Sequence, residues 1–419
     1  MQHKAYNNEL GVLNLVRTSG DNNKLWHYVN CCCAIIFVTS RLGMSAIVVD
    51  FGSSTCKAGL AQDSAPYMFP SLMKYSRDEG ERKSSWNVSD AKKKSSLPYF
   101  RQGIERVWRP IGPQGVNSWE HMEAICQYAL FGPHIGTNSS GELPVCLSEP
   151  ATFLFQPKSH EKISEIMFET LKVPSLYMGN QQKFALYSAG KTTGVVADLG
   201  AEVSWITSIV NGSINKDDII RFSVHGKYLE EKFNESLSSH GYTFCTAEER
   251  DYIRRIKEKL MYVSKHADTE AVGDEYQKMD KTYEFPDGSR LDLGEEVFRV
   301  PEHIWEANGG LHKQILEAVR AQHEDCQWEL RNNILVCGGS ALLMGLEERL
   351  RSELSGACSD FRIISGSTNK ITASWRGAAD FARSHDFYNL CILKEDYDEC
   401  GARVLNNLSG NCRNKAARH

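Results

Sequence analysis

The chain contains two copies of one short pattern, in which an apolar run is followed by Asp, one further residue and Gly. The first copy contains Asp50 and Gly52, and the second contains Asp198 and Gly200. Each apolar run predicts a buried strand, and the residues after each Gly predict a tight turn into a second strand. Two such hairpins indicate an internal duplication, with two related lobes that face each other across one ligand.

The residue types around the first turn suit a phosphate group. Gly52 allows a ligand to approach the backbone closely, and successive N–H groups of residues 53–55 can form an anion-binding concavity. Lys57 supplies a cation, and Asp50 supplies an oxygen ligand for magnesium, directly or through water. An ordinary hairpin with polar turn residues explains this segment equally well by itself, and the second copy is what favours a ligand site.

Composition limits the class of protein. A chain of 419 residues is long enough for two sizeable cores. A net charge of −5 does not suggest a nucleic-acid-binding protein, which normally carries a basic surplus. The 13 cysteines are mostly scattered singly and show no C-x-x-C pair, which favours reduced thiols in the cytosol or nucleus. The apolar run 29–38 is too short to span a bilayer.

Two segments differ from the rest of the chain. Residues 1–43 are polar and Asn-rich, and we expect them to be poorly ordered. They are either a genuine N-terminal extension or an upstream segment that is not part of the functional protein. Residues 72–109 are polar, basic and Ser-rich, which predicts an exposed mobile loop or small lobe. A nucleic-acid patch is disfavoured there because the aromatic residues are not interleaved with the charges.

Periodicity and capping residues predict the elements between and after the hairpins. Helices are expected over 118–128, 159–171, 181–189, from 246 onward, 311–319 and 342–354, strands over 143–147, 173–178 and 333–337, and a hairpin over 281–300 with its turn at 286–289. Gly338 and Gly339 follow the strand at 333–337. A helix directly after them would present backbone N–H groups to a ligand, and a plain β–α turn is the alternative.

Several segments of the sequence resemble the actin family, in the same order along residues 44–400. The segments are 50–59, 166–170, 186–194, 198–200, 255–260, 283–288 and 336–340. The first of them resembles actin's first phosphate loop, 198–200 its second phosphate loop, and 336–340 its adenine loop. The resemblance implies an α/β, two-lobed actin-like ATPase fold, in which duplicated ribonuclease-H-like lobes enclose a central nucleotide cleft.

The resemblance also implies the extent of each lobe. The smaller lobe would comprise 44–188 and 373–419, with 72–110 as its mobile tip. The larger lobe would comprise 189–372, with 225–307 as its outer part. The cleft between them would hold ATP and Mg²⁺, or Ca²⁺ in its place.

Site residues are implied by matching position. Asp50 and Asp198 would hold the hydrated cation, and Gln181 would position the attacking water. The residues implied for the phosphates are Gly52, Ser53, Ser54, Thr55, Lys57 and Gly200, and those implied for the ribose and adenine are Gly226, Lys257, Glu258, Gly338, Gly339 and Leu342.

Three residues of the second loop depart from the actin pattern. Ala201 replaces an acid that helps to fix the phosphates and metal, Glu202 replaces a Gly, and Trp205 replaces a His near the catalytic water. A carboxylate at Glu202 would crowd or repel the phosphates. Since phosphoryl transfer depends on positioning and electrostatics, we expect slow or absent hydrolysis. A shortened loop at 306–311 and the altered tip disfavour self-polymerisation.

These observations favour a divergent actin or actin-related protein, an ATP-binding cytoskeletal protein that is a subunit of a multiprotein assembly and at most a slow ATPase. The expected partners are other actin-family or complex subunits and actin-binding proteins, without direct nucleic-acid binding or a membrane span. The expected location is the cytoplasm and cytoskeleton, and a nuclear role stays open. The alternatives are a filament-forming actin with weak ATPase activity, a nucleotide-free scaffold and, much less favoured, a sugar kinase.

Overall fold

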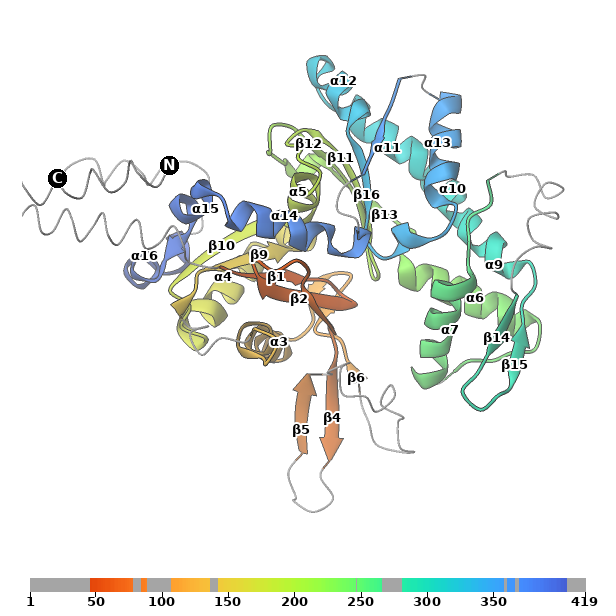
Figure 1. Cartoon of the computed structure of the whole chain (residues 1–419), viewed down its shortest axis with the longest axis horizontal. Coiled ribbons are helices and arrows are strands. Elements are labelled where there is room, and N and C mark those ends of the chain that lie inside the picture. Colours follow the sequence, from red (N-terminus) through yellow and green to blue (C-terminus); the bar gives the residue numbers. More distant parts are fainter. Residues whose placement is uncertain are drawn as a thin grey trace, which may run out of the picture. The chain divides into compact units, whose positions relative to one another are not determined.

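Two mixed β-sheets, each built around one of the Asp-containing hairpins, form the frame of the structure (Figure 1). The computed structural model describes residues 46–77, 84–88, 107–135, 142–245, 247–265, 281–357, 360–365 and 369–404. The expectation of poor order for residues 1–43 lies outside these residues, as does the capping residue Thr246 of the predicted helix.

The first sheet contains the first hairpin. Its strand order is β18(Ile392–Leu393), β10(Ser175–Asn180), β9(Val145–Glu149), β1(Ile47–Phe51), β2(Thr55–Leu60) and β3(Tyr67–Pro70). Strand β1 pairs antiparallel with β2 and parallel with β9, and β9 pairs parallel with β10. Every residue of β1 is buried, which explains why this strand is a continuous apolar run up to its Asp.

The second sheet repeats this arrangement around the second hairpin. Its order is β13(Ile219–Phe222), β12(Ser204–Ile209), β11(Gly194–Leu199), β16(Ile334–Cys337) and β17(Ile363–Ile364). Strand β11 pairs antiparallel with β12 and parallel with β16. The two hairpins leave loops of equal length, residues 52–55 and 200–203. The common order confirms the predicted two-lobed α/β fold with duplicated lobes.

Helices cover both faces of the first sheet. Alternate residues of β1 point to opposite faces: Ile47 and Val49 pack in a cluster with α3(Trp119–Phe131), whereas Val48 packs in a cluster with α5(Gln181–Tyr187) and α14(Ala373–Ala382). The helix α4(Pro157–Glu165) continues as a π-helical turn over Ile166–Thr170. The C-terminal helices are α15(His385–Leu390) and α16(Lys394–Cys400).

The second sheet has its own set of helices. These are α6(Gly226–Ser239), α7(Ala247–Leu260), α9(Glu296–Arg299), α10(His303–Glu306), α11(Leu311–Arg320), α12(Glu324–Asn332) and α13(Leu346–Ala357). Helices α6 and α7 pack against each other beside the small hairpin of β14(Thr282–Glu284) and β15(Arg290–Asp292), as Figure 1 shows. No helix among the described residues is both long and apolar enough to cross a membrane.

The helices α5 and α14 cross at very close range. Helix α5 leads directly from β10 of the first sheet to β11 of the second, and α14 follows the second sheet in sequence and packs against both α5 and β1. A Cβ atom at Gly377 would lie 1.7 Å from the carbonyl oxygen of Phe184. The indole of the fully buried Trp375 donates to the carbonyl oxygen of Val48 at 3.0 Å. The two helices that connect the sheets, α5 and α14, therefore approach each other most tightly at Gly377.

The structure corrects two element predictions. The predicted hairpin over 281–300 is a hairpin only as far as Asp292, because residues 296–299 are helical. The Glu296 carboxylate accepts from the N–H of Gly294 at 2.7 Å, which favours a helix start there. The helix predicted from 342 begins at Leu346 as α13, after a short 3₁₀ turn at Ser340–Leu342 and a glycine with positive φ at Gly345.

The predicted lobe boundaries, 44–188 with 373–419 and 189–372, stay predictions. Within the predicted tip at 72–110, the strands β4(Met73–Arg77), β5(Ser84–Val88) and β6(Val107–Trp108) form a three-stranded sheet. Three consecutive lysines of this segment, at 92–94, lie outside the described residues.

Candidate functional site

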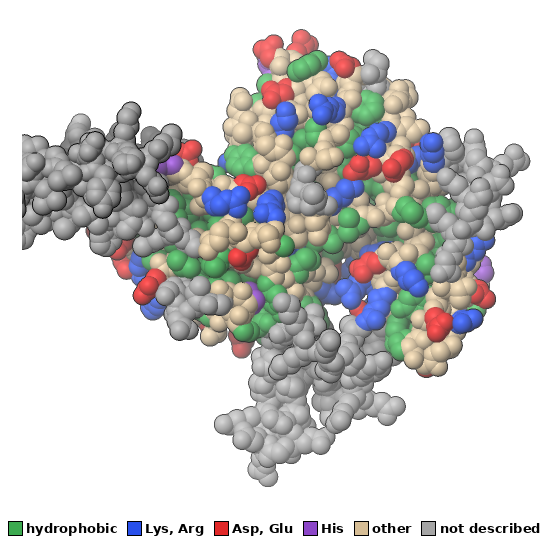
Figure 2. Space-filling view, in the orientation of Figure 1, with side chains coloured by type: hydrophobic (Ala, Val, Ile, Leu, Met, Phe, Trp, Pro, Cys, Tyr) green, Lys and Arg blue, Asp and Glu red, His purple; other side chains and the backbone are tan. Residues whose placement is uncertain are grey.

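A cavity of about 470 Å³ lies between the loops of the two hairpins. Figure 2 shows Lys and Arg side chains at the edge of a hollow on this face of the molecule. The cavity brings together every site residue predicted from the sequence: Asp50, Gly52, Ser53, Ser54, Thr55, Lys57, Gln181, Asp198, Gly200, Gly226, Lys257, Glu258, Gly338, Gly339 and Leu342. Their individual roles stay predictions.

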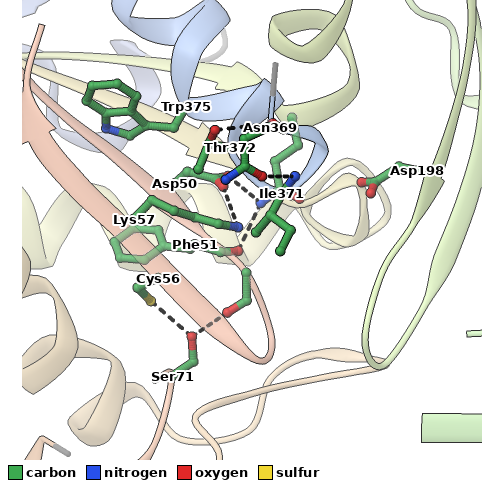
Figure 3. Close-up of polar contacts among 12 residues, drawn as sticks. Asp50, Phe51, Cys56, Lys57, Ser71, Asp198, Asn369, Ile371, Thr372 and Trp375 are labelled. Atoms are coloured by element: carbon green, nitrogen blue, oxygen red, sulfur yellow. Dashed lines mark hydrogen bonds and ion pairs between the residues drawn. The ribbon is translucent and has the colours of Figure 1, made fainter. Parts of the chain in front are cut away.

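On the first hairpin, Asp50 and Lys57 form a buried ion pair. The Lys57 Nζ lies 2.9 Å from Asp50 Oδ2 (Figure 3), and the two residues are 8% and 2% exposed. The Gln181 Nε2 donates to Asp50 Oδ1 at 2.8 Å and to the Phe51 carbonyl oxygen at 2.9 Å. Burial lowers the pKa of Lys57, but the charge and hydrogen bond of Asp50 raise it by more, and the net shift is upward. The lysine is therefore a fixed cation at the cavity wall.

Both hairpin loops require glycine at the same position. A Cβ atom at Gly52 would lie 2.6 Å from the carbonyl oxygen of Thr55, and one at Gly200 would lie 2.3 Å from that of Val203. Ser71 stabilises the first loop, because its N–H donates to the Ser54 carbonyl oxygen at 3.0 Å. Each loop is therefore a tight turn whose backbone borders the cavity.

On the second hairpin, Asp198 is held by a residue that the sequence analysis missed. The Gln182 Nε2 donates to Asp198 Oδ2 at 2.8 Å. Asn180 caps helix α5, since its side chain accepts from the N–H groups of Gln182 and Lys183. Successive residues of the first helical turn point in different directions, so Gln181 reaches one hairpin and Gln182 the other. The only sequence feature that could have indicated this contact is the pair of adjacent glutamines after the predicted strand at 173–178.

The two carboxylates face the cavity from opposite hairpins, as Figure 3 shows for Asp50 and Asp198. Burial raises the pKa of Asp198, with a further contribution from the Asp50 charge, while Gln182 and Lys57 oppose the shift. Among the described residues no group of three or more His, Cys, Asp or Glu is arranged to hold a metal. Two carboxylates are nevertheless what Mg²⁺ takes when phosphates and water supply its other ligands. The donor set thus fits a cation that arrives with a phosphate ligand.

The start of helix α6 forms a third wall. The N–H groups of Gly226 and Lys227 donate to the carbonyl oxygens of Gly200 and Ala201 at 2.9 and 2.8 Å. These bonds attach the helix to the second loop. Close by, the Lys257 Nζ donates to the Gly226 carbonyl oxygen at 3.2 Å and to Glu230 Oε1 at 2.7 Å.

The side chain of Glu202 is placed differently from the expectation that it crowds the phosphates. It is 7% exposed, and its Oε2 lies 3.4 Å from Lys227 Nζ. Glu202 is absent from the residues that line the cavity, whereas its neighbours Ala201 and Val203 line it. Glu202 therefore does not line the cavity, and a cation of α6 lies beside its carboxylate.

The end of β16 forms the fourth wall. Gly338 has a φ of 92°, and a Cβ atom there would lie 2.5 Å from the Leu199 carbonyl oxygen. A Cβ atom at Gly339 would meet nothing within 4 Å. Met344, Lys370 and Arg254 also line the cavity. The sequence analysis missed these three, since no local pattern distinguishes them from surface residues.

Trp205 closes the cavity on the side of the first sheet. It is 6% exposed, and its ring stacks on that of Phe155 with centroids 6.0 Å apart and an interplanar angle of 19°. Phe155 belongs to a short 3₁₀ helix, Ala151–Phe155, that follows β9. An element of one lobe therefore packs against a hairpin residue of the other.

Two sheets of the same order, joined by two crossing helices and bordering one cavity, define a two-lobed α/β protein of the actin-like class. Comparison with protein families gives the same result from the sequence. The family model described as Actin matches residues 41–408, and the chain belongs to the actin family.

Proposed function

We propose that this protein binds ATP together with Mg²⁺ in the cavity between the two hairpins. The observation that carries the proposal is the placement of Asp50 and Asp198 on facing hairpins, with Lys57 and the loop 52–55 beside them. An ion held between two carboxylates and a phosphate chain would offset the repulsion between those negative charges.

Each wall has a proposed task. Lys57 and the backbone of Ser53, Ser54 and Thr55 hold the terminal phosphates. Asp50 and Asp198 orient the hydrated cation, which neutralises phosphate charge when bound. The ribose and adenine lie against the walls formed by α6, α7 and the end of β16, where Gly226, Lys257, Glu258, Gly338, Gly339 and Leu342 border the cavity.

Turnover is proposed to be slow or absent. Among the described residues, both hydrogen bonds of the Gln181 side chain use its Nε2, which leaves its Oε1 to accept a hydrogen bond from a water. Near the same end of the cavity, Trp205 presents a stacked indole, which has no group able to take up a proton. The chain thus retains an amide that can orient a water, and it has no side chain at position 205 that could take up a proton from that water.

The effect of the nucleotide is proposed to be conformational. A ligand held by both hairpins favours the arrangement of the lobes that it binds best, and the lobes are joined through the crossing of α5 and α14. We propose that this change serves an assembly, with other actin-family or complex subunits and actin-binding proteins as partners, in the cytoplasm and cytoskeleton. Pelleting of the pure protein in Mg²⁺, K⁺ and ATP would instead favour a filament-forming actin.

Direct binding of a fluorescent ATP analogue tests the proposal, with Gly339→Leu as the variant. Because a side chain at Gly339 would enter open cavity space, it should exclude the ligand without disturbing the ligand-free fold. Gly356→Leu is the matched control, since Gly356 is exposed on α13 with nothing within 4 Å and lies outside the cavity. We expect binding by the wild type and the control and none by Gly339→Leu. Absence of binding by the wild type would make the scaffold interpretation correct.

A further inference from the structure

Two aromatic rings meet beside the cavity, one held by each sheet. Phe155 ends the 3₁₀ helix that follows β9 of the first sheet, and Trp205 lies in β12 of the second. Their rings stack with centroids 6.0 Å apart. Trp205 is 6% exposed and borders the cavity, whereas Phe155 is 47% exposed and is not among the residues that line it. Phe155 therefore covers part of Trp205 without bordering the cavity itself.

Apolar side chains extend the contact between the rings. Trp205 forms a small buried cluster with Ala151, which begins the same 3₁₀ helix, and with Ile219 of β13. Partly buried side chains from both sides pack against this cluster: Leu154, Val203 and Ile214. Ring stacking and the burial of apolar surface both stabilise such a contact. Side chains therefore join the two sheets here, in addition to the connections through α5 and α14.

Each ring is fixed to its own sheet. Within the 3₁₀ helix, Phe153 is buried and packs in the same core cluster as Val49 of β1. In the second sheet, Trp205 lies in the middle of three paired strands, opposite Asp198 of β11 and Arg221 of β13. A movement that separates the two hairpins therefore pulls the rings apart.

A ligand in the cavity depends on the same movement. Asp50 and Asp198 border the cavity from opposite hairpins, and a ligand held by both is released only when the hairpins separate. Opening of parts that enclose a ligand often sets the rate of its release. A contact that has to break before the hairpins separate adds to the barrier for that step. The stack of Phe155 on Trp205 is such a contact.

We propose that the stack of Phe155 on Trp205 acts as a latch that slows both the entry and the release of ATP. This assignment rests on the proposed function and concerns the regulation of that site. Both rings belong to the chain, so the latch does not need a bound nucleotide to form. Its loss should therefore accelerate association and dissociation by similar factors. The dissociation constant, which is the ratio of the two rate constants, should change little.

The test measures both rate constants for a fluorescent ATP analogue in Mg²⁺, with the full-length wild type and Phe155→Ala. Stopped-flow mixing gives the association rate constant, and a chase with excess unlabelled ATP gives the dissociation rate constant. Because one stacked aromatic pair is lost, we expect each rate constant to rise about threefold to tenfold. The dissociation constant should stay within about threefold of the wild-type value. Phe155→Tyr keeps the ring and should behave as the wild type.

Phe131→Ala is the matched control. Phe131 is 41% exposed at the end of α3 and does not line the cavity, so its loss should change neither rate constant. Thermal unfolding checks that Phe155→Ala is folded, as we expect for a side chain that is nearly half exposed. If it is not folded, Phe155→Leu replaces it in the test. Leucine keeps an apolar side chain and removes the ring, so both rate constants should again rise.

Two results would overturn the latch alone. The first is a pair of unchanged rate constants in the variant without the ring. The second is faster dissociation with unchanged association and a matching loss of affinity, which would show that Phe155 supports the bound ligand instead. A wild type that does not bind the analogue overturns the proposed function and the latch with it.

Discussion

Trp205 occupies in the second hairpin the position that Lys57 occupies in the first, since each residue lies opposite the Asp of its own hairpin. The two hairpins therefore share one backbone arrangement but differ in the charge of the residue opposite the Asp. The first hairpin contains an ion pair, whereas Asp198 of the second is held by the neutral amide of Gln182. We infer that the first hairpin provides most of the cation charge for a phosphate ligand, and that the second provides an apolar wall at Trp205.

Replacement of Lys57 by methionine should strongly destabilise the protein. The carboxylate of Asp50 is 2% exposed, and without the lysine it would be a buried charge without its cation. Breaking a buried pair in this way costs about 3–5 kcal/mol. Denaturant unfolding of Lys57→Met, followed by fluorescence, measures the loss.

The double variant Asp50→Asn with Lys57→Met separates charge from packing. It removes both charges, so its unfolding free energy should lie closer to that of the wild type than that of the single variant does. Both variants should fail to bind ATP. A double variant less stable than Lys57→Met would show that the ion pair is not what stabilises this hairpin.

Gly377→Ala should loosen the connection between the lobes. The added methyl group would lie 1.7 Å from the Phe184 carbonyl oxygen, so α5 and α14 would have to move apart. We expect a cost at the upper end of the about 1–3 kcal/mol typical of overpacking, measured by denaturant unfolding. Gly356→Ala, at an exposed position of α13 with open space, is the control and should leave stability unchanged or slightly raised. Equal stability of the two variants would contradict a tight crossing.

The fold was predictable from the sequence where local patterns determine it. The apolar runs that end at Asp50 and Asp198 predict two hairpins with glycine turns, each at the centre of a sheet. The structure confirms both hairpins. The helix at 296–299 was missed because Val297, Phe298 and Val300 suit a strand as well as a short helix, and tertiary packing decides between them.

The site was less completely predictable, for a different reason. The residues of the hairpins and of the double glycine all border one cavity, but Met344 and Lys370 reach it only through the packing of separate elements, as does the contact of Gln182 with Asp198. The direction of the Glu202 side chain was also beyond the sequence, because it depends on Lys227 of α6. Sequence patterns identify which loops meet, and tertiary structure decides which side chains face inward.

The ion pair of His160 with Glu149 should give stability a pH dependence. Burial lowers the pKa of His160, but the hydrogen bond and charge of Glu149 raise it by more, and the net shift is upward from 6.5. The contribution is therefore fully present below about pH 6.5 and is lost as the pH rises through the folded-state pKa.

His160→Gln provides the measurement for this prediction. Unfolding free energies of the wild type and the variant should differ most in mildly acidic solution and converge as the pH rises above neutrality. The comparison must be made as a difference, because burial lowers the pKa values of His225 and His312 and these residues impose the opposite pH dependence on both proteins. A constant difference at all pH values would contradict a charged His160.

Glu202→Gln should have little effect on nucleotide affinity. Its carboxylate is paired with Lys227 and lies outside the cavity lining, so removal of the charge should not relieve repulsion of the phosphates. We expect an ATP affinity within about threefold of the wild type, which corresponds to less than about 1 kcal/mol. A large gain in affinity, measured by competition with a fluorescent ATP analogue, would show that the carboxylate faces the ligand.

Trp205 should report ligand binding through its fluorescence. Its indole lines the cavity beside Phe155, so a charged ligand that displaces water there changes the polarity around the ring. Addition of ATP and Mg²⁺ should change the emission of the wild type, and Trp205→Phe should lose most of that change while its affinity for a fluorescent analogue persists. Trp328→Phe is the control, because Trp328 is 63% exposed on α12 and outside the cavity. If Trp205→Phe kept the full response, the ligand would lie away from the wall at Trp205. The proposed positions of the phosphates and of the adenine in the cavity would then have to be exchanged.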